Sequence, residues 1–83
     1  MFKLHQTVIS NSGRDSGSFL AVVATDERYV YVCDGKSRPL DNPKRKNPVH
    51  LTPLEETLEN DAFRSDRALR KALAVVRAKH NKE

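Results

Sequence analysis

The sequence predicts a small, mainly β domain, in which a closed barrel of five short strands is followed by one or two short helices. Three observations support this fold class. The chain has 83 residues, which is enough for one domain with a small core. Up to Leu51, short apolar and β-branched runs alternate with turns that contain glycine or aspartate, and after Leu51 the apolar residues recur at helical spacing. We therefore divide the chain into a barrel, residues 1–51, and a helical C-terminal extension, residues 52–83.

Five strands are predicted in the first part. The three longest are the runs HQTVIS, SFLAVVAT and RYVYVCD, at residues 5–10, 18–25 and 28–34. Two shorter pieces, residues 37–40 and 49–51, complete the set. Strands this short favour a closed barrel, because closure removes the exposed edges that a small open sheet would leave. The proline-rich stretch RPLDNPKRKNP, which holds the basic run from Lys44 to Lys46, is predicted as an irregular surface loop.

Two helices are predicted in the extension. Residues 52–55, TPLE, form a capping box, with threonine at the N-cap, proline at the first helical position and glutamate three residues after the cap. This pattern favours a short helix to about residue 60. Ser65 and Asp66 begin a second helix, which runs through RALRKALAVVRAKH and carries one apolar stripe made of Leu69, Ala72, Leu73 and Val76. We expect the stripe to pack against the barrel or against the preceding helix.

Charge and cysteine content limit the class of protein. The chain has 15 Lys and Arg against 11 Asp and Glu, a net charge of +4. Such an excess favours a polyanionic partner such as nucleic acid, or it serves only solubility. Cys33 is the single cysteine, so no internal disulfide can form, and we expect a buried thiol in a reducing compartment. No apolar run approaches the roughly 18 residues of a membrane span, and a signal-peptide core is lacking, so we expect a soluble cytoplasmic protein without membrane contact.

The residues that carry enzyme chemistry do not form a recognisable site. The three histidines lie far apart, and one cysteine cannot supply a zinc site of the usual spacing. A P-loop, a dinucleotide-binding glycine pattern and a nucleophile elbow are absent from the sequence. The aspartates of the first part fall at predicted turns, where carboxylates cap backbone amides. We therefore expect a binding protein without enzymatic activity, cofactor or metal.

Two motifs of the first part occur together in a known family. SGRDSG follows the first predicted strand, and DGKSR follows the third strand about twenty residues later. With the apolar strands between them, the basic loop and the strand end VHLT, they resemble a KOW domain over residues 6–52. The resemblance is to the KOW-bearing large-subunit ribosomal proteins of archaea and eukaryotes, and to their small bacterial relatives, the KOW-domain RNA-binding proteins. One departure is that HQT, residues 5–7, stands where many members carry a glycine before the first strand.

The resemblance implies a small SH3-like barrel that binds RNA, commonly ribosomal RNA, through the loop between its first two strands. The partners that it implies are rRNA and the ribosome, with ribosomal proteins as further contacts, and we expect a monomer when the protein is free. Glycines in this loop let the backbone approach a phosphate and leave amides free to bind it, while Arg14 can fork two hydrogen bonds onto a phosphate or stack on a base. We expect Asp15 to cap the turn or to hold Arg14. The predicted RNA-binding residues are Ser12, Gly13, Arg14, Gly17, Lys36, Arg38, Lys44, Arg45 and Lys46.

Other interpretations of the same residues stay open from sequence. The glycine-containing loop is compatible with a plain hairpin turn, and the run from Lys44 to Lys46 with a solvated charge run. Tyr29 and Tyr31 stack on bases if their face of the strand is open, and otherwise belong to the core. The alternative function is a protein-interaction module that contacts ribosomal or transcription proteins through the barrel or the C-terminal helix. Finally, the helices either complete the core of a barrel too small to be stable alone, or extend the RNA footprint through Arg64, Arg67, Arg70 and Lys71.

Overall fold

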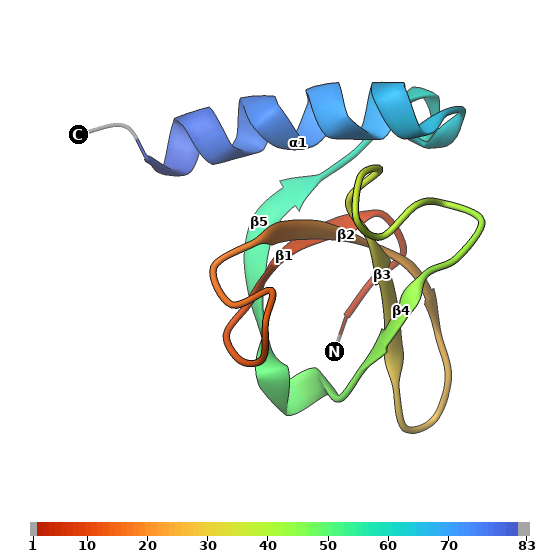
Figure 1. The fold of residues 1–83 in the computed structure, drawn as a ribbon, viewed down its shortest axis with the longest axis vertical. Helices are drawn as coiled ribbons and strands as arrows, with labels where there is room; N and C mark the ends of the chain where they lie inside the picture. The colour runs from red at the N-terminus through yellow and green to blue at the C-terminus, as the bar shows by residue number, and fades with distance from the viewer. Residues whose placement is uncertain (1, 82–83) are drawn as a thin grey trace.

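The computed structural model describes residues 2–81 and shows one antiparallel sheet of five strands with one α-helix packed on it (Figure 1). The elements in chain order are β1 (Gln6–Ser10), β2 (Phe19–Thr25), β3 (Val30–Cys33), β4 (Lys44–Lys46), the 3-10 turn η1 (Pro48–His50), β5 (Leu51–Thr57), the 3-10 turn η2 (Asn60–Phe63) and α1 (Asp66–His80). The strand order in the sheet is β4-β3-β2-β1-β5. The fold is therefore mainly β with a C-terminal helix, as predicted. Residue 1 and residues 82–83 of the predicted extension lie outside the described residues.

The first three predicted strands are confirmed. β1 pairs with β2 at Val8 and Leu20, both fully buried, and β2 pairs with β3. The polar turn between β2 and β3 is held by Asp26, whose carboxylate accepts hydrogen bonds from the backbone amides of Arg28 at 2.8 Å and Tyr29 at 2.7 Å. An aspartate that binds the amides just after it closes a turn without help from the rest of the chain. Local contacts therefore close the turn of this hairpin.

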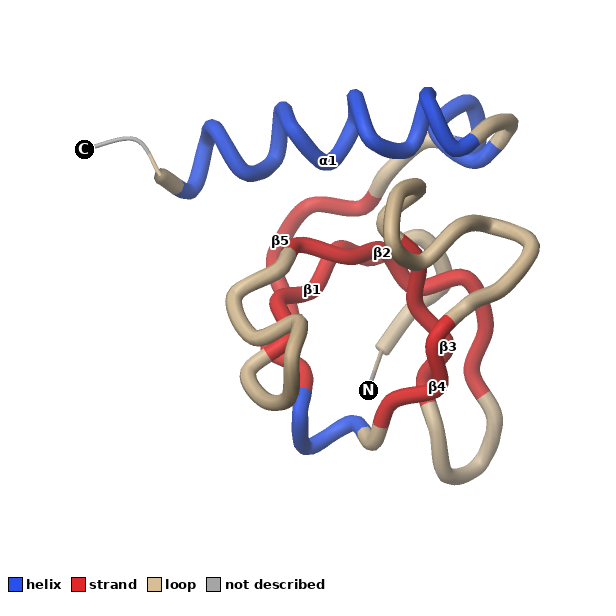
Figure 2. Tube along the Cα trace, viewed as in Figure 1, coloured by secondary structure: helices blue, strands red, loops and turns tan. Residues whose placement is uncertain are grey.

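The predicted closure of the barrel is wrong. β4 and β5 are the two edges of the sheet, and no backbone ladder joins them within residues 2–81. Figure 2 shows that the sheet curls strongly, with η1 connecting its two edges. In this connection Pro48 has no amide to donate, and the side chain of Asn47 accepts a hydrogen bond from the amide of Val49. The segment therefore turns between the two edges instead of extending either strand.

The fourth and fifth strands are not where we predicted them. Residues 37–40 form no strand, because the carboxylate of Asp34 accepts hydrogen bonds from backbone amides of the residues that follow and closes the chain into a turn. The fourth strand is instead Lys44–Lys46, which we predicted as part of a surface loop and which pairs with β3. The predicted strand at residues 49–51 overlaps β5 only at Leu51.

The predicted helix over residues 52–60 is also wrong. Most of this stretch belongs to β5, which pairs with β1. Side chains of β1 strengthen the pairing, since Gln6 Nε2 and Thr7 Oγ1 both donate to backbone carbonyls of β5. Pro53 suits the first turn of a helix but is equally tolerated in an edge strand, where one side needs no amide donor. The predicted division at residues 51 and 52 falls inside β5, so both parts of the chain contribute to one sheet.

Two apolar clusters hold the fold together, one on each face of the sheet. The face opposite α1 carries the cluster of Val8, Leu20, Val22, Val30, Val32 and Leu51, with Phe2 packed against it. The other face packs against α1 and carries the cluster of Phe19, Ala21, Cys33, Leu69, Leu73 and Val76. The start of the helix is as predicted, with the Ser65 hydroxyl accepting a hydrogen bond from the amide of Ala68. The apolar stripe of α1 therefore packs against the sheet.

The buried thiol and the N-terminal turn of α1 meet the same part of the sheet. Cys33 is fully buried, as expected, and burial raises the pKa of its thiol to about 11. Next to it, Arg70 Nη1 donates to the carbonyl of Gly35 at 2.6 Å, and Asp66 Oδ1 accepts from the amide of Leu40 at 2.8 Å. Gly35 has a φ of +78°, and a Cβ there would collide with the carbonyl oxygen of Asp66. α1 thus fixes the turn after β3, which carries the motif DGKSR.

Candidate nucleic-acid interface

The loop between β1 and β2 is a compact, hydrogen-bonded turn. Gly13 and Gly17 have φ angles of +80° and +88°, a conformation that costs other residues energy. The amide of Gly17 donates to the carbonyl of Ser10 at 2.7 Å, and the amide of Ser18 donates to the carbonyl of Asp15 at 2.9 Å. The expectation of a free Gly17 amide for a phosphate is therefore wrong. Gly17 shapes the loop, and side chains of the loop must supply the contacts to a ligand.

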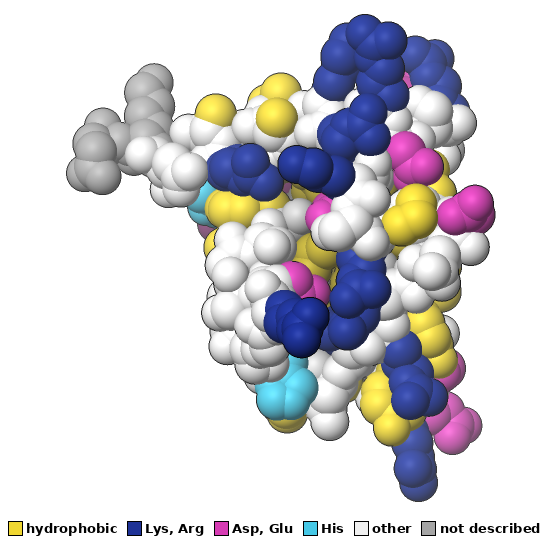
Figure 3. All heavy atoms as spheres, viewed as in Figure 1, with side chains coloured by type: hydrophobic (Ala, Val, Ile, Leu, Met, Phe, Trp, Pro, Cys, Tyr) yellow, Lys and Arg dark blue, Asp and Glu magenta, His cyan; other side chains and the backbone are white. Residues whose placement is uncertain are grey.

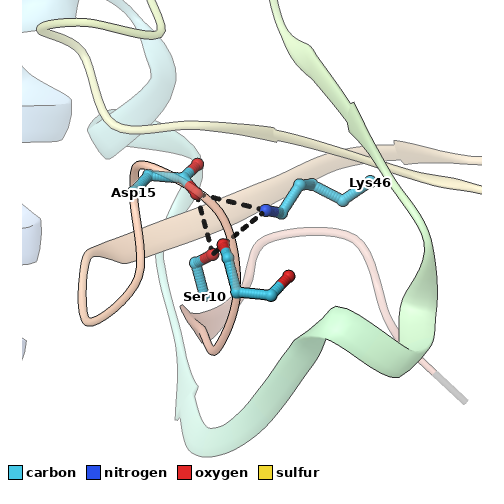
Figure 4. Close-up of polar contacts among 4 residues, drawn as sticks. Ser10, Asp15 and Lys46 are labelled. Atoms are coloured by element: carbon cyan, nitrogen blue, oxygen red, sulfur yellow. Dashed lines mark hydrogen bonds and ion pairs between the residues drawn. The ribbon is translucent and has the colours of Figure 1, made fainter.

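Asp15 anchors this loop to the far edge of the sheet. Its Oδ1 atom accepts hydrogen bonds from Lys46 Nζ on β4, at 3.1 Å, and from the Ser10 hydroxyl, at 2.9 Å (Figure 4). Lys46 Nζ also donates to the carbonyl of Ser12 at 3.4 Å. Burial by itself would raise the pKa of Asp15, but the hydrogen bonds from Lys46 and Ser10 outweigh it, and the pKa lies below its ordinary value. Asp15 therefore holds Lys46, and not Arg14 as we considered.

A pocket of about 490 Å³ lies between this loop and the turn that follows β3. It is lined by Gly13, Arg14, Asp15, Ser18, Ser37, Arg38, Lys44 and Lys46. The curl of the sheet and the contact of α1 with Gly35 thus bring together two motifs that lie about twenty residues apart in sequence. We call this the basic pocket.

The basic pocket contains both free and neutralised cations. Arg14, Arg38 and Lys44 form no ion pair with any of residues 2–81, whereas Lys46 is 7% exposed and paired with Asp15. Because Asp15 already accepts from Lys46, it does little to offset the other three charges. Three unpaired cations around one hollow can bind phosphate oxygens of a polyanion.

The remaining predicted residues lie around the basic pocket or away from it. Ser12 contributes its backbone carbonyl to Lys46, and Gly17 and Lys36 are exposed outside the lining. Arg45 lies on the other face of β4, with its guanidinium 4.5 Å from the centre of the Tyr29 ring. Successive side chains of a strand point to opposite faces, so the basic run cannot act as one patch. The expectation that Lys46 is a free surface cation is wrong, because it sits under the loop as a counter-ion.

Sequence reasoning missed two kinds of residue that shape this surface. Ser18 and Ser37 line the basic pocket, and only their position in the two glycine-containing turns pointed to them. Arg70, which we considered as an RNA contact, binds the carbonyl of Gly35 and holds the turn after β3 in place. Figure 3 shows Lys and Arg side chains gathered in an interrupted band on one face, from α1 across the loops to the tip of the β2–β3 hairpin. Positive charge thus prevails on this face of the molecule.

No protein-family model matches the sequence, and a search of curated proteins finds no match. Within residues 2–81, no group of three or more His, Cys, Asp or Glu side chains is placed to hold a metal ion. No helix in this part of the chain combines the length and hydrophobicity needed to cross a membrane.

Proposed function

We propose that this chain is a non-catalytic RNA-binding module that docks on structured RNA, as a ribosomal or ribosome-associated protein of the large subunit. The observation that carries this proposal is the basic pocket, in which Arg14, Arg38 and Lys44 surround one hollow without a carboxylate partner among residues 2–81. Arginine forks suit phosphate oxygens, and a concave site with several cations favours a phosphate chain over a single anion. We further propose a cytoplasmic location for the protein.

The proposed family is the KOW domain, with an SH3-like arrangement of the sheet. Two features of the chain support it. The motif SGRDSG occupies the loop between β1 and β2, where the resemblance puts RNA contact, and DGKSR forms the turn that faces it across the basic pocket. The sheet has five short, strongly curled antiparallel strands. α1 lies outside the proposed KOW unit and supports the second turn.

A titration across a salt series tests RNA binding directly. The full chain is titrated with fragments of large-subunit rRNA, and the affinity is measured by fluorescence anisotropy or filter binding. Three or so phosphate contacts predict a log–log slope of affinity against salt of about −2 to −3. A flat salt response, or no binding to any structured fragment, would contradict the proposal.

Charge reversal then locates the site. We expect Arg14→Glu to weaken binding by about ten- to a hundredfold, because it removes a charge-assisted contact and adds repulsion. Lys71→Glu, on the exposed surface of α1, makes the same change in net charge away from the basic pocket. We expect it to have a small effect. If both variants lose affinity equally, binding is not localised to the basic pocket.

A second function, a protein-interaction module, is favoured by one observation. An open groove runs between α1 and the segment from the end of β5 to η2, and Val75 at its side is 63% exposed. Its apolar lining is made of Leu58, Ala62, Ala68, Ala72, Val75 and Val76. On this alternative, the chain should remain associated with ribosomal proteins after ribonuclease treatment. Val75→Glu should abolish that association. Val49→Glu, at a residue that is 74% exposed and outside the groove, is the matched control.

A further inference from the structure

The outer face of β3 is covered by α1 along only part of its length. Strand alternation places Tyr29, Tyr31 and Cys33 on one face and the buried Val30 and Val32 on the other. Cys33 packs in the cluster that α1 covers, but neither tyrosine belongs to an apolar cluster, and both are only half-buried. The interpretation of the tyrosines as core residues is therefore wrong. An aromatic surface remains open beside the β2–β3 turn.

The two tyrosine rings are held in place by polar contacts. Tyr31 pairs with Arg45 across β3 and β4, and its hydroxyl donates to Asp26 Oδ2 at 2.7 Å. The guanidinium of Arg45 lies over the Tyr29 ring. Asp26 is itself fixed by the amides of the turn, so the rings need little ordering when a ligand arrives. Together with Glu27 and Arg28, these residues line a hollow of about 360 Å³, which we call the tyrosine hollow.

The charges of the tyrosine hollow differ from those of the basic pocket. Arg28 and Arg45 are matched by Asp26 and Glu27, so the formal charges of its lining cancel. A phosphate would gain little from such a site. A flat heteroaromatic ring gains contact with tyrosine and guanidinium planes, and Glu27, exposed beside them, can accept from an exocyclic amine. The chemistry of the tyrosine hollow favours a nucleobase over a phosphate.

β4 connects the two sites. Lys44 lines the basic pocket and Arg45 lines the tyrosine hollow, and these are neighbouring residues of one edge strand. Because their side chains point to opposite faces, a nucleic-acid strand that crosses the edge at β4 meets cations on one side and aromatic rings on the other. β4 pairs only with β3 among the described strands, so it is an edge strand of the sheet.

We propose that the tyrosine hollow binds one unpaired nucleobase of RNA, stacked against the tyrosine rings, while the adjoining backbone lies in the basic pocket. This inference rests on the proposed function and sharpens it: the preferred ligand is a helix with a bulged or looped-out nucleotide, and a fully paired helix lacks the base that fills the hollow. Recognition by stacking tolerates different bases, since each has a π face.

Intrinsic fluorescence tests this proposal, because the chain has two tyrosines and no tryptophan, and both tyrosines line the tyrosine hollow. The full chain is titrated with a hairpin RNA that carries a one-nucleotide bulge, and with the same hairpin fully paired. Emission is corrected for RNA absorbance with free N-acetyltyrosinamide. We expect the bulged hairpin to quench most of the tyrosine emission at saturation and the paired hairpin to quench little. Binding of the bulged hairpin without quenching would overturn the inference.

Three variants separate stacking from phosphate binding. We expect Tyr29→Ala to weaken binding of the bulged hairpin by about five- to a hundredfold and to leave the paired hairpin unchanged. Tyr29→Phe keeps the ring and should bind like the native chain, which shows that the ring and not the hydroxyl is required. Unchanged binding of the paired hairpin by Tyr29→Ala shows that the loss does not arise from a damaged fold. Arg14→Glu should weaken both hairpins.

The outcomes distinguish the two proposals. If both hairpins bind with equal affinity and Tyr29→Ala changes neither, the proposed function stands and the base site is refuted. If neither the hairpins nor any structured rRNA fragment binds, with salt as low as about 50 mM, RNA binding itself is refuted and the base site with it.

Discussion

Lys46 on the edge strand β4 and Asp15 in the β1–β2 loop form an ion pair of 3.1 Å that ties the loop to the opposite edge of the curled sheet. Their side chains are 8% and 18% exposed, so water screens the pair only weakly. Lys46 also donates to the carbonyl of Ser12, which fixes the loop at a second point. One ion pair thus holds the wall of the basic pocket that carries Arg14.

Removal of the carboxylate of this pair should destabilise the fold. Asp15→Asn leaves the buried ammonium of Lys46 without its counter-ion, and we expect the free energy of unfolding to fall by about 2–3 kcal/mol. Urea denaturation followed by circular dichroism measures it. Asp41→Asn, at an exposed aspartate, is the control and should change little. If the cost comes from the unpaired ammonium, Lys46→Met in the Asp15→Asn background should recover part of the stability. A larger loss in the double variant would contradict this explanation.

The same pair predicts an acid-dependent loss of stability. The pKa of Asp15 is lower in the folded chain than its ordinary value of 3.8, so its contribution is complete above about pH 4 and is lost as the pH falls through the folded pKa. Asp26 and Glu56 also have lowered pKa values, owing first to hydrogen bonds from Tyr31 and His80. Protonation of any of these three carboxylates should therefore lower the stability of the native chain at acid pH. The contribution of Asp15 is the difference between the native chain and Asp15→Asn, which should be constant from pH 7 to 5 and shrink below pH 4. A constant difference down to pH 2 would contradict it.

Gly17 and Gly35, two of the three glycines in the turns, should respond differently to alanine. Gly35→Ala meets both a positive φ of +78° and a collision with the carbonyl of Asp66, so either the turn or α1 must shift. Gly17→Ala meets a similar φ, +88°, but no atom lies within 4 Å of the new Cβ. We expect a loss of about 1–2 kcal/mol at Gly17, from the backbone conformation alone, and a clearly larger loss at Gly35. Thermal denaturation compares the two, and equal losses would mean that the packing of α1 on this turn contributes no stability.

Shortening a buried side chain of α1 should show that the helix belongs to the core. Leu73 is 3% exposed and packs in the cluster with Phe19, Ala21 and Cys33, and we expect Leu73→Ala to cost about 2–4 kcal/mol. Val75→Ala, on the exposed side of the same helix, should cost less than about 0.5 kcal/mol. A single cooperative transition should be seen for both variants, because sheet and helix share this cluster. Loss of helix signal in a separate, earlier transition would show that α1 docks weakly.

The parts of the fold that local sequence specifies were predicted correctly. β1, β2 and β3 follow from apolar runs of strand length, and the helix start follows from Ser65, whose side chain needs only residues of its own first turn. One error, the strand at residues 37–40, was local, because amides just after Asp34 bind its carboxylate. The other errors concern segments whose structure depends on distant partners. The sequence TPLE satisfies a capping box, yet pairing with β1 and the hydrogen bonds from Gln6 and Thr7 hold this segment as β5. A local preference worth about 1 kcal/mol cannot compete with a whole strand pairing.

The sequence by itself determined most of the residues that shape the candidate site, namely the glycines that adopt positive φ and the basic residues of the two motifs and of the run at residues 44–46. Only the tertiary structure decided which of those cations are free. Lys46 is neutralised by Asp15, 31 residues away. Arg70 keeps its charge but donates to the carbonyl of Gly35, 35 residues away, and Arg45 lies on Tyr29 outside the basic pocket. Arg14, Arg38 and Lys44 remain for a ligand. The reason is physical: the charge of a side chain is a property of its residue, but its availability depends on what the fold places within hydrogen-bonding distance.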